Sequence, residues 1–339
     1  MQSSKELTTR IDTLDYLRGF ALMGIILVNI LSLLSVTSPV PRTSDATYLR
    51  FLYLFVEGRF YTIFTFLFGV GFYIFITRAN AKGKNGFVLF LRRILVLFLY
   101  GLVHVQFHPG EALTVYAVCG LIILPFYKAN KKVNLVFGIA MLIVLSFFAL
   151  KIFMVFPLML LGIAAGQYRV FEQISQQWKK TAIFTVIMSL LSVAGLIYQY
   201  QYAPFEFGNV SDTTYLETQQ FLSIGITIGP IVSAFYVGML ILLLKFEIVQ
   251  KVLSPLKSYG RMALTNYVSQ TVFILLAGKL LDLFDQISYV QSLYFCLTIY
   301  VIQLIFSTIW LRYFRFGPLE WVWRMMTYFE CIPIRKAAD

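Results

Sequence analysis

The chain has 339 residues, of which 59% are hydrophobic and only 13% are charged, and its mean hydropathy is +0.77. These values exclude a soluble globular protein and are typical of a polytopic membrane protein. The formal net charge of +12 comes from basic residues spread over several short segments. This spread argues against a nucleic-acid interface, which gathers its basic residues in one patch or stripe.

Apolar runs long enough to cross a bilayer recur along the whole sequence. A spanning helix needs about 20 mostly apolar residues, and ten such runs predict an all-α transmembrane bundle of about ten spans. The fifth and sixth are separated only by Lys151 and its neighbours, so they could instead form one bent element or a re-entrant pair. The runs lie at about 14–36, 60–77, 90–107, 111–127, 133–150, 153–168, 181–201, 221–244, 263–282 and 288–311.

The loops between these runs are short, which predicts one continuous membrane domain. Basic residues are retained on the cytoplasmic side of short loops. With both termini inside, all but five of the 28 Lys and Arg residues fall on that side, the exceptions being Arg42, Arg50, Arg59, Lys151 and Lys279. This asymmetry predicts that both termini are cytoplasmic.

The first run carries polar residues on one face. Eleven residues separate Arg18 from Asn29, which on an α-helix is three turns plus about 20°, and Asp15 lies three residues before Arg18 on the same face. Polar groups held in hydrocarbon are costly and usually mark a site. The structural alternatives are an Asp15–Arg18 ion pair within the helix and a hydrogen bond from Asn29 to a neighbouring helix.

The third run ends with the two histidines of the chain, His104 and His108, just before Glu111. His104 lies eleven residues beyond Arg93, so it is expected at a depth similar to that of Asn29. A neutral imidazole there could accept a proton from a hydroxyl while Asn29 donates to a developing oxyanion and Glu111 orients the imidazole. The alternative is that both histidines are interfacial or structural hydrogen-bonding groups.

Two further arginines lie near predicted cytoplasmic ends. Arg261 opens the ninth run, where it could bind a phosphate or simply anchor the topology. Arg324 lies in a tail with alternating charged and aromatic residues, which suits an amphipathic helix on the inner leaflet. That helix either anchors the chain or covers a nucleotide-bearing cosubstrate by stacking and by pairing with phosphates. The three cysteines have no paired spacing and no histidine cluster, so neither a disulfide nor a metal site is expected.

Several segments carry a family resemblance. Residues 14–29 read LDYLRGFALMGIILVN, residues 58–71 read GRFYTIFTFLFGVG and residues 110–117 read GEALTVYA. Residues 260–267 (GRMALTNY) and 315–328 (RFGPLEWVWRMMTY) look like a C-terminal domain of unknown function, number 418. Together these segments resemble the YeiB family of bacterial membrane proteins over nearly the whole chain. This family resemblance divides the membrane domain into an N-terminal half (1–170) and a C-terminal half (171–339).

The YeiB family is in turn similar to membrane acyltransferases of the heparan glucosaminide acetyltransferase and glycan O-acyltransferase kind. That similarity implies a protein of the bacterial cytoplasmic membrane, surrounded by lipids, that passes an acyl group from cytoplasmic acyl-CoA, for example acetyl-CoA, to an envelope glycan or lipid headgroup. Asn29 stands where the glycan enzymes have a histidine, and residues 31–44, where the heparan enzyme has its catalytic histidine, contain none.

Two hypotheses therefore follow from the sequence. In the first, the chain is an acyltransferase in which Arg18, Arg93 and Arg261 meet the phosphates of acyl-CoA. In the second, it is a transporter or lipid-binding membrane protein in which Arg18, Asn29 and His104 line a pathway for a small anionic solute. One continuous polar passage, open to the inside and ending between Asn29 and His104, would favour the first, and two alternately sealed gates would favour the second.

Overall fold

The computed structural model describes residues 10–204, 207 and 212–336 of the chain, and for residues 212–214 it describes the backbone alone. This part of the chain is helical, and its one β-bridge joins Phe314 to Arg335. The α-helices are α2 (Asp12–Leu33), α3 (Ser44–Phe55), α4 (Arg59–Ala81), α5 (Gly86–His104), α6 (Leu113–Ile122), α7 (Lys131–Phe147), α8 (Val155–Gln167), α9 (Trp178–Gln201), α10 (Asp212–Leu243), α11 (Glu247–Val252), α12 (Ser254–Arg261), α13 (Ala263–Leu280), α14 (Tyr289–Tyr313) and α15 (Pro318–Tyr328). Two 3₁₀ helices, η1 (Leu124–Lys128) and η2 (Lys151–Met154), complete the order.

The prediction of an all-α membrane protein is confirmed. Six helical stretches of the described chain are long and apolar enough to cross a membrane: Asp12–Leu33, Ser44–Ala81, Gly86–His104, Trp178–Gln201, Tyr215–Leu243 and Tyr289–Tyr313. Each of the ten predicted runs contains a helix, but α6 and α8 are short, and the count of ten spans stays a prediction. The run at 111–127 is interrupted because Pro125 lies at the start of η1 and has no backbone N–H to continue an α-helix.

The fifth and sixth runs form two separate helices. Helix α7 ends at Phe147, and α8 begins at Val155 after the turn of η2. The two helices pack antiparallel, since Asn134 near the start of α7 donates to Gln167 at the end of α8, at 3.0 Å. The structure therefore has a helical hairpin here, with Lys151 at its turn.

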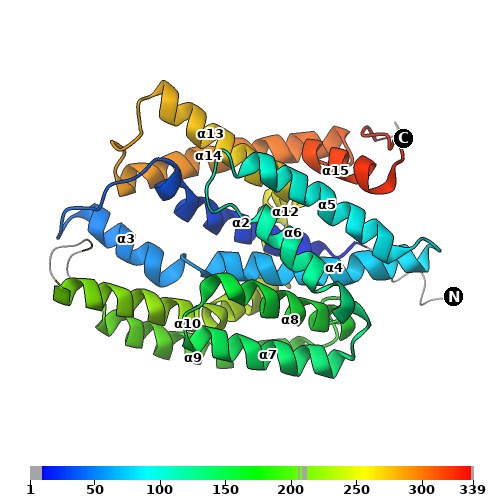
Figure 1. Cartoon of the computed structure of the whole chain (residues 1–339), viewed down its shortest axis with the longest axis horizontal. Coiled ribbons are helices and arrows are strands. Elements are labelled where there is room, and N and C mark those ends of the chain that lie inside the picture. The colour runs from blue at the N-terminus through cyan, green and yellow to red at the C-terminus, as the bar shows by residue number, and fades with distance from the viewer. Residues whose placement is uncertain (1–9, 205–206, 208–211, 337–339) are drawn as a thin grey trace.

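Helix α2 occupies the middle of the bundle and contacts α4, α12, α13 and α14 (Figure 1). Helix α4 lies antiparallel to α2 and packs on its other side against α8, while α9 packs on α10 and α15 packs on α5. The beginning of α2 and the tail helix α15 lie at the same end of the bundle, at the right of Figure 1. The side of the membrane to which this end belongs stays a prediction.

Small residues allow the central helices to approach closely. A Cβ atom on Gly69 of α4 would lie 2.1 Å from the carbonyl oxygen of Met159 in α8, and one on Gly260 would lie 1.9 Å from the carbonyl oxygen of Asp15 in α2. Both values are far below van der Waals contact, so these positions require glycine. Close backbone approach through small residues is the usual way in which membrane helices pack.

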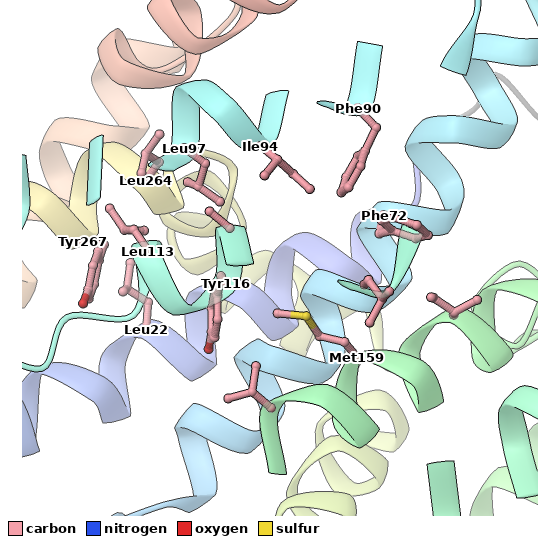
Figure 2. Close-up of a cluster of buried hydrophobic side chains, with 14 of the residues drawn as sticks. Leu22, Phe72, Phe90, Ile94, Leu97, Leu113, Tyr116, Met159, Leu264 and Tyr267 are labelled. Carbon is pink, nitrogen blue, oxygen red and sulfur yellow. The ribbon is translucent and has the colours of Figure 1, made fainter. Parts of the chain in front are cut away.

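A cluster of buried apolar side chains joins α4, α5, α6, α8, α12 and α13 at the centre of the molecule (Figure 2). Figure 2 shows Phe72, Phe90 and Tyr116 within this cluster. The Tyr116 hydroxyl is satisfied there by Thr65 of α4, at 2.7 Å. This cluster forms one wall of the cavity described next.

Candidate functional site

A cavity of about 1100 Å³ runs along α4 through the centre of the bundle. The cavity is lined along the whole length of α4, from Gly58, just before the helix, to Lys82, just after it. Because α4 has 23 residues, the cavity extends about 34 Å, close to the thickness of a hydrocarbon core of about 30 Å. Exposed residues line it at both ends, with Lys82 and Lys84 at one and Gly110 and Ile152 at the other.

One end of the cavity is strongly basic, and we call it the arginine end. Its lining includes eight basic residues and three acidic ones: Arg10, Arg18, Arg78, Lys82, Lys84, Arg93, Arg261 and Arg324 against Asp15, Glu320 and Glu330. The four arginines predicted from the sequence to meet a cosubstrate, Arg18, Arg93, Arg261 and Arg324, therefore line one cavity, together with Asp15. Basic residues that only set the membrane topology need to lie at the surface. These side chains instead line one common cavity.

The acidic residues of the arginine end already have partners. Asp15, which is 1% exposed, accepts hydrogen bonds from Arg10 at 2.5 Å and from Arg18 at 3.1 Å. The predicted Asp15–Arg18 pair is thus present, and Arg18 also lies against Gly71 of α4, where a Cβ would be 3.4 Å from its Nη2 atom.

Glu320 and Glu330 are engaged elsewhere. Glu320 accepts hydrogen bonds from the backbone N–H groups of Leu264 and Thr265, at 2.7 and 3.0 Å, and from the Thr265 hydroxyl. It therefore satisfies the N-terminus of α13 and docks α15 onto it. Glu330 pairs with Lys84 at 2.8 Å.

Three guanidinium groups of the arginine end have no acidic partner within the described chain: those of Arg93, Arg261 and Arg324. The Nε atoms of Arg261 and Arg324 are buried without a hydrogen-bond acceptor. Desolvation lowers the pKa of Arg261, and the nearby charge of Arg10 lowers it further, against the opposing effect of Asp15. An anion bound among these groups would offset the repulsion between them.

Aromatic rings hold two of these arginines. The guanidinium carbon of Arg93 lies 3.6 Å from the ring centroid of Trp323 and 5.0 Å from that of Phe75. Arg324 lies 4.8 Å from the ring of Phe316. The predicted amphipathic tail helix is present as α15, and it presents Trp323 and Arg324 to the cavity.

The opposite end of the cavity, which we call the Asn29 end, is lined by Asn29, Glu57, Gly110, Glu111 and Lys151. Asn29 lies in the last turns of α2, on the face that carries Arg18, as the helical spacing predicts. Its carboxamide has no hydrogen-bond partner within the described residues, so the alternative of a hydrogen bond to a neighbouring helix is not seen. Both amide hydrogens are free to meet a ligand.

Glu111 reaches the cavity, but His104 lies behind it. The Nδ1 atom of His104 is 3.6 Å from the Glu111 carboxylate and has no hydrogen-bond partner, while its Nε2 atom is 2.9 Å from the Thr271 hydroxyl. Glu111 also accepts from the backbone N–H groups of Leu113 and Thr114, at 2.5 and 2.7 Å. The carboxylate thus satisfies the N-terminus of α6, and the His104 imidazole does not line the cavity.

His108 is buried beside His104, with the two ring centroids 5.6 Å apart. Burial, and then the neighbouring His104, lower the pKa of His108 to about 4, against the opposing charge of Glu111. His108 is therefore uncharged at neutral pH. No group of three or more His, Cys, Asp or Glu side chains suited to a metal is found in the described residues.

Sequence reasoning missed the contact between Glu57 and Lys151, which form an ion pair at the Asn29 end. The two residues are 94 positions apart, and no local pattern connects them. The available signal was that Lys151 is an isolated basic residue in an apolar stretch, on the side predicted to lie opposite most of the Lys and Arg residues.

Two family models match the chain. Residues 10–173 match the model described as heparan-alpha-glucosaminide N-acetyltransferase, catalytic, and residues 165–330 match a protein of unknown function, DUF418. The cavity is therefore lined by residues from both matched regions. No solved structure matches the chain.

Curated relatives match over nearly their full length. The chain is 62% identical to an uncharacterised 39.9 kDa protein in the amylase 3′ region of Bacillus acidopullulyticus, over 98% of this chain and 99% of that one. It is 27% identical to the uncharacterised protein YxaH of Bacillus subtilis, over 96% of both chains. It is 26% identical to the uncharacterised protein YeiB of Escherichia coli, over 93% of this chain and 95% of that one.

Proposed function

This chain belongs to the YeiB family of membrane proteins, which is related to acyltransferases, and we propose that it transfers an acyl group across the bilayer. The donor is a cytoplasmic acyl-CoA such as acetyl-CoA, and the acceptor is a hydroxyl or amine of an envelope glycan or lipid headgroup. The observation that carries the proposal is one cavity with arginines at one end and a carboxamide at the other that have no partner among the described residues.

In this proposal the arginine end binds the phosphates of acyl-CoA. Guanidinium groups form bidentate hydrogen bonds with phosphate oxygens, and they do so more strongly away from bulk water. Among the described residues, no acid pairs with Arg93, Arg261 or Arg324, and Trp323 offers a ring on which adenine stacks. Asp15 holds Arg18 in place at the same end.

The pantetheine arm then lies along the apolar middle of the cavity, which is walled by Phe64, Phe68, Phe72 and Tyr116. Its thioester reaches the Asn29 end, where the carboxamide of Asn29 donates to the oxyanion that forms when the carbonyl is attacked. Donors preorganised for a developing oxyanion are among the largest contributions to catalysis. His104 lies behind Glu111, with its Nδ1 atom 3.6 Å from the Glu111 carboxylate, so the imidazole takes no direct part in the attack.

The predicted orientation agrees with this assignment. With both termini cytoplasmic in the bacterial cytoplasmic membrane, the arginine end opens to the inside, where acyl-CoA is made, and the Asn29 end lies toward the outside. The asymmetry of Lys and Arg residues supports that orientation.

A second candidate function is transport or binding of a small anionic solute or lipid. Two observations favour it: exposed residues line the cavity at both ends, and neither histidine reaches it. Under this alternative the arginines attract the anion and no bond is made or broken. Release of free thiol from acetyl-CoA separates the two functions.

The test of the donor site is equilibrium binding of acetyl-CoA to detergent-purified protein by calorimetry. We expect micromolar binding by the wild type and an affinity about tenfold or more weaker in Arg93→Gln, a loss of about 1.4 kcal/mol. Arg92→Gln is the matched control, because the neighbouring Arg92 lies over Phe329, at 4.4 Å, and does not line the cavity. No binding at millimolar ligand, or equal losses in both variants, would contradict the proposal.

A further inference from the structure

The proposed transfer needs a group that accepts the proton of the attacking hydroxyl or amine. Five carboxylates of the described residues line the cavity, and three of them, Asp15, Glu320 and Glu330, lie at the arginine end. The remaining two, Glu57 and Glu111, lie at the Asn29 end, where the thioester is attacked. The proton acceptor must lie where the thioester is attacked, so the choice is restricted to Glu57 and Glu111.

Glu111 is already engaged by both of its oxygens. Its Oε2 atom accepts from the backbone N–H of Leu113, and its Oε1 atom accepts from the backbone N–H and the hydroxyl of Thr114. Accepting a further proton would weaken the hydrogen bonds that satisfy the start of α6. His104 does not line the cavity, and its Nε2 atom is 2.9 Å from the Thr271 hydroxyl.

One carboxylate oxygen of Glu57 is available to accept a proton. Its Oε1 atom pairs with Lys151, and its Oε2 atom has no partner within the described chain. The side chain is 23% exposed and that of Lys151 is 42% exposed. The pair lies where the cavity meets the surface, so an acceptor arriving from outside the bundle reaches it.

The backbone around Glu57 is held firmly. Gly58 adopts a φ of +77°, a left-handed conformation that favours glycine. A Cβ there would meet nothing within 4 Å, so the backbone conformation, and not a lack of space, favours glycine at this position. The guanidinium of Arg59, which is 1% exposed, donates to the carbonyl oxygen of Glu57 at 2.6 Å and to Gln199 at 3.0 Å. A rigid turn of this kind positions a functional carboxylate more precisely than a mobile loop does.

We propose that Glu57 is the proton acceptor for the attacking hydroxyl or amine at the Asn29 end, held there by Lys151; this inference rests on the proposed function. The acceptor's oxygen or nitrogen bonds to the thioester carbonyl carbon while its proton moves to Glu57. The carbon–sulfur bond then breaks, and the leaving thiolate takes the proton from Glu57. The products are an ester or amide and free coenzyme A, and the carboxylate is restored.

The test measures release of free thiol from acetyl-CoA by detergent-purified full-length protein, with water or with hydroxylamine as the acceptor. Hydroxylamine attacks thioesters without help from a base, so it bypasses a missing proton acceptor. In Glu57→Gln we expect water-dependent release to fall about 100-fold or more. We expect hydroxylamine-dependent release and the calorimetric affinity for acetyl-CoA to stay within about threefold of the wild type.

Asp12→Asn is the matched control, because Asp12 forms a comparable acid–lysine pair with Lys257 but does not line the cavity. It should leave both reactions unchanged. Equal loss of both reactions in Glu57→Gln would mean a structural role, and unchanged water-dependent release would mean that another group takes the proton; either result overturns the inference.

The outcome for the wild type separates this inference from the proposed function. Wild-type protein that binds acetyl-CoA, but releases thiol no faster than buffer with either acceptor, contradicts the proposed transfer, and the inference with it, and favours transport or binding instead. Wild-type protein that releases thiol, with Glu57→Gln releasing it equally fast in water, overturns the inference alone. Wild-type protein that does not bind acetyl-CoA overturns the proposed function, and the inference with it.

Discussion

Trp323 and Arg93 contact each other twice: the guanidinium carbon of Arg93 lies 3.6 Å from the Trp323 ring centroid, and the indole N–H of Trp323 donates to the backbone carbonyl oxygen of Arg93 at 2.8 Å. The two residues are 230 positions apart and belong to α15 and α5, which lie side by side (Figure 1). The tail helix is thereby part of the cavity wall rather than only a membrane anchor.

This contact predicts that Trp323→Leu weakens binding of acetyl-CoA. A cation–π interaction contributes about 0.5 to 2 kcal/mol, so the Kd should rise about two- to thirtyfold. Calorimetry measures the change. Trp321→Leu is the control, because Trp321 donates to the carbonyl oxygen of Ile332 and does not line the cavity. An equal loss of affinity in the two variants would show that α15 as a whole, and not the Trp323 ring, supports binding.

Asn29 should affect the chemical step and not the binding step. In Asn29→Ala we expect thiol release from acetyl-CoA to fall by about 10²- to 10³-fold, as is usual when one oxyanion donor is removed, with the Kd for acetyl-CoA unchanged within about twofold. Ser32→Ala is the control, since Ser32 is exposed one turn later and lines no part of the cavity. A variant with lower affinity and an unchanged rate would place Asn29 in substrate binding instead.

His108 should make the protein less stable in mild acid. Its pKa is lowered from 6.5 to about 4 in the folded chain, so between these values the unfolded chain binds more protons and the free energy of unfolding falls as the pH falls. The stabilisation is fully present above about pH 6.5 and is lost as the pH falls toward 4. Thermal unfolding in detergent at pH 7.5 and pH 5 measures this loss.

The variant His108→Gln isolates this effect from other titrating groups, including the adjacent His104 and Glu111. We expect its Tm to fall less than that of the wild type over the same pH interval. Parallel pH dependences for the two proteins would mean that His108 is not the group responsible.

Gly69→Ala should destabilise the bundle, because the new Cβ would lie 2.1 Å from the carbonyl oxygen of Met159 and would push α4 away from α8. Overpacking of this kind costs about 1–3 kcal/mol or more. Gly229→Ala in α10 is the matched control, since a Cβ there meets nothing within 4 Å, and alanine in a helix is slightly favoured over glycine. Thermal unfolding in detergent should therefore give a lower Tm for Gly69→Ala alone.

Several features could be predicted from the sequence because they depend on local properties. Hydropathy over about 20 residues indicates helices that satisfy their own backbone groups in lipid, and each predicted run contains a helix. Helical spacing placed Arg18 and Asn29 on one face, and both line the cavity. Alternating charged and aromatic residues predicted the tail helix α15.

Other features were decided only by the tertiary structure, because they depend on how distant helix faces pack. The spacing along the third run predicted that His104 lies at a depth similar to that of Asn29. In the structure, the His104 imidazole contacts Thr271 of α13 and does not line the cavity. The pair of Glu57 and Lys151 forms only because the α7–α8 hairpin folds against the start of α4. Spacing along a helix indicates which residues share a face, but the glycine contacts between helices determine what that face meets.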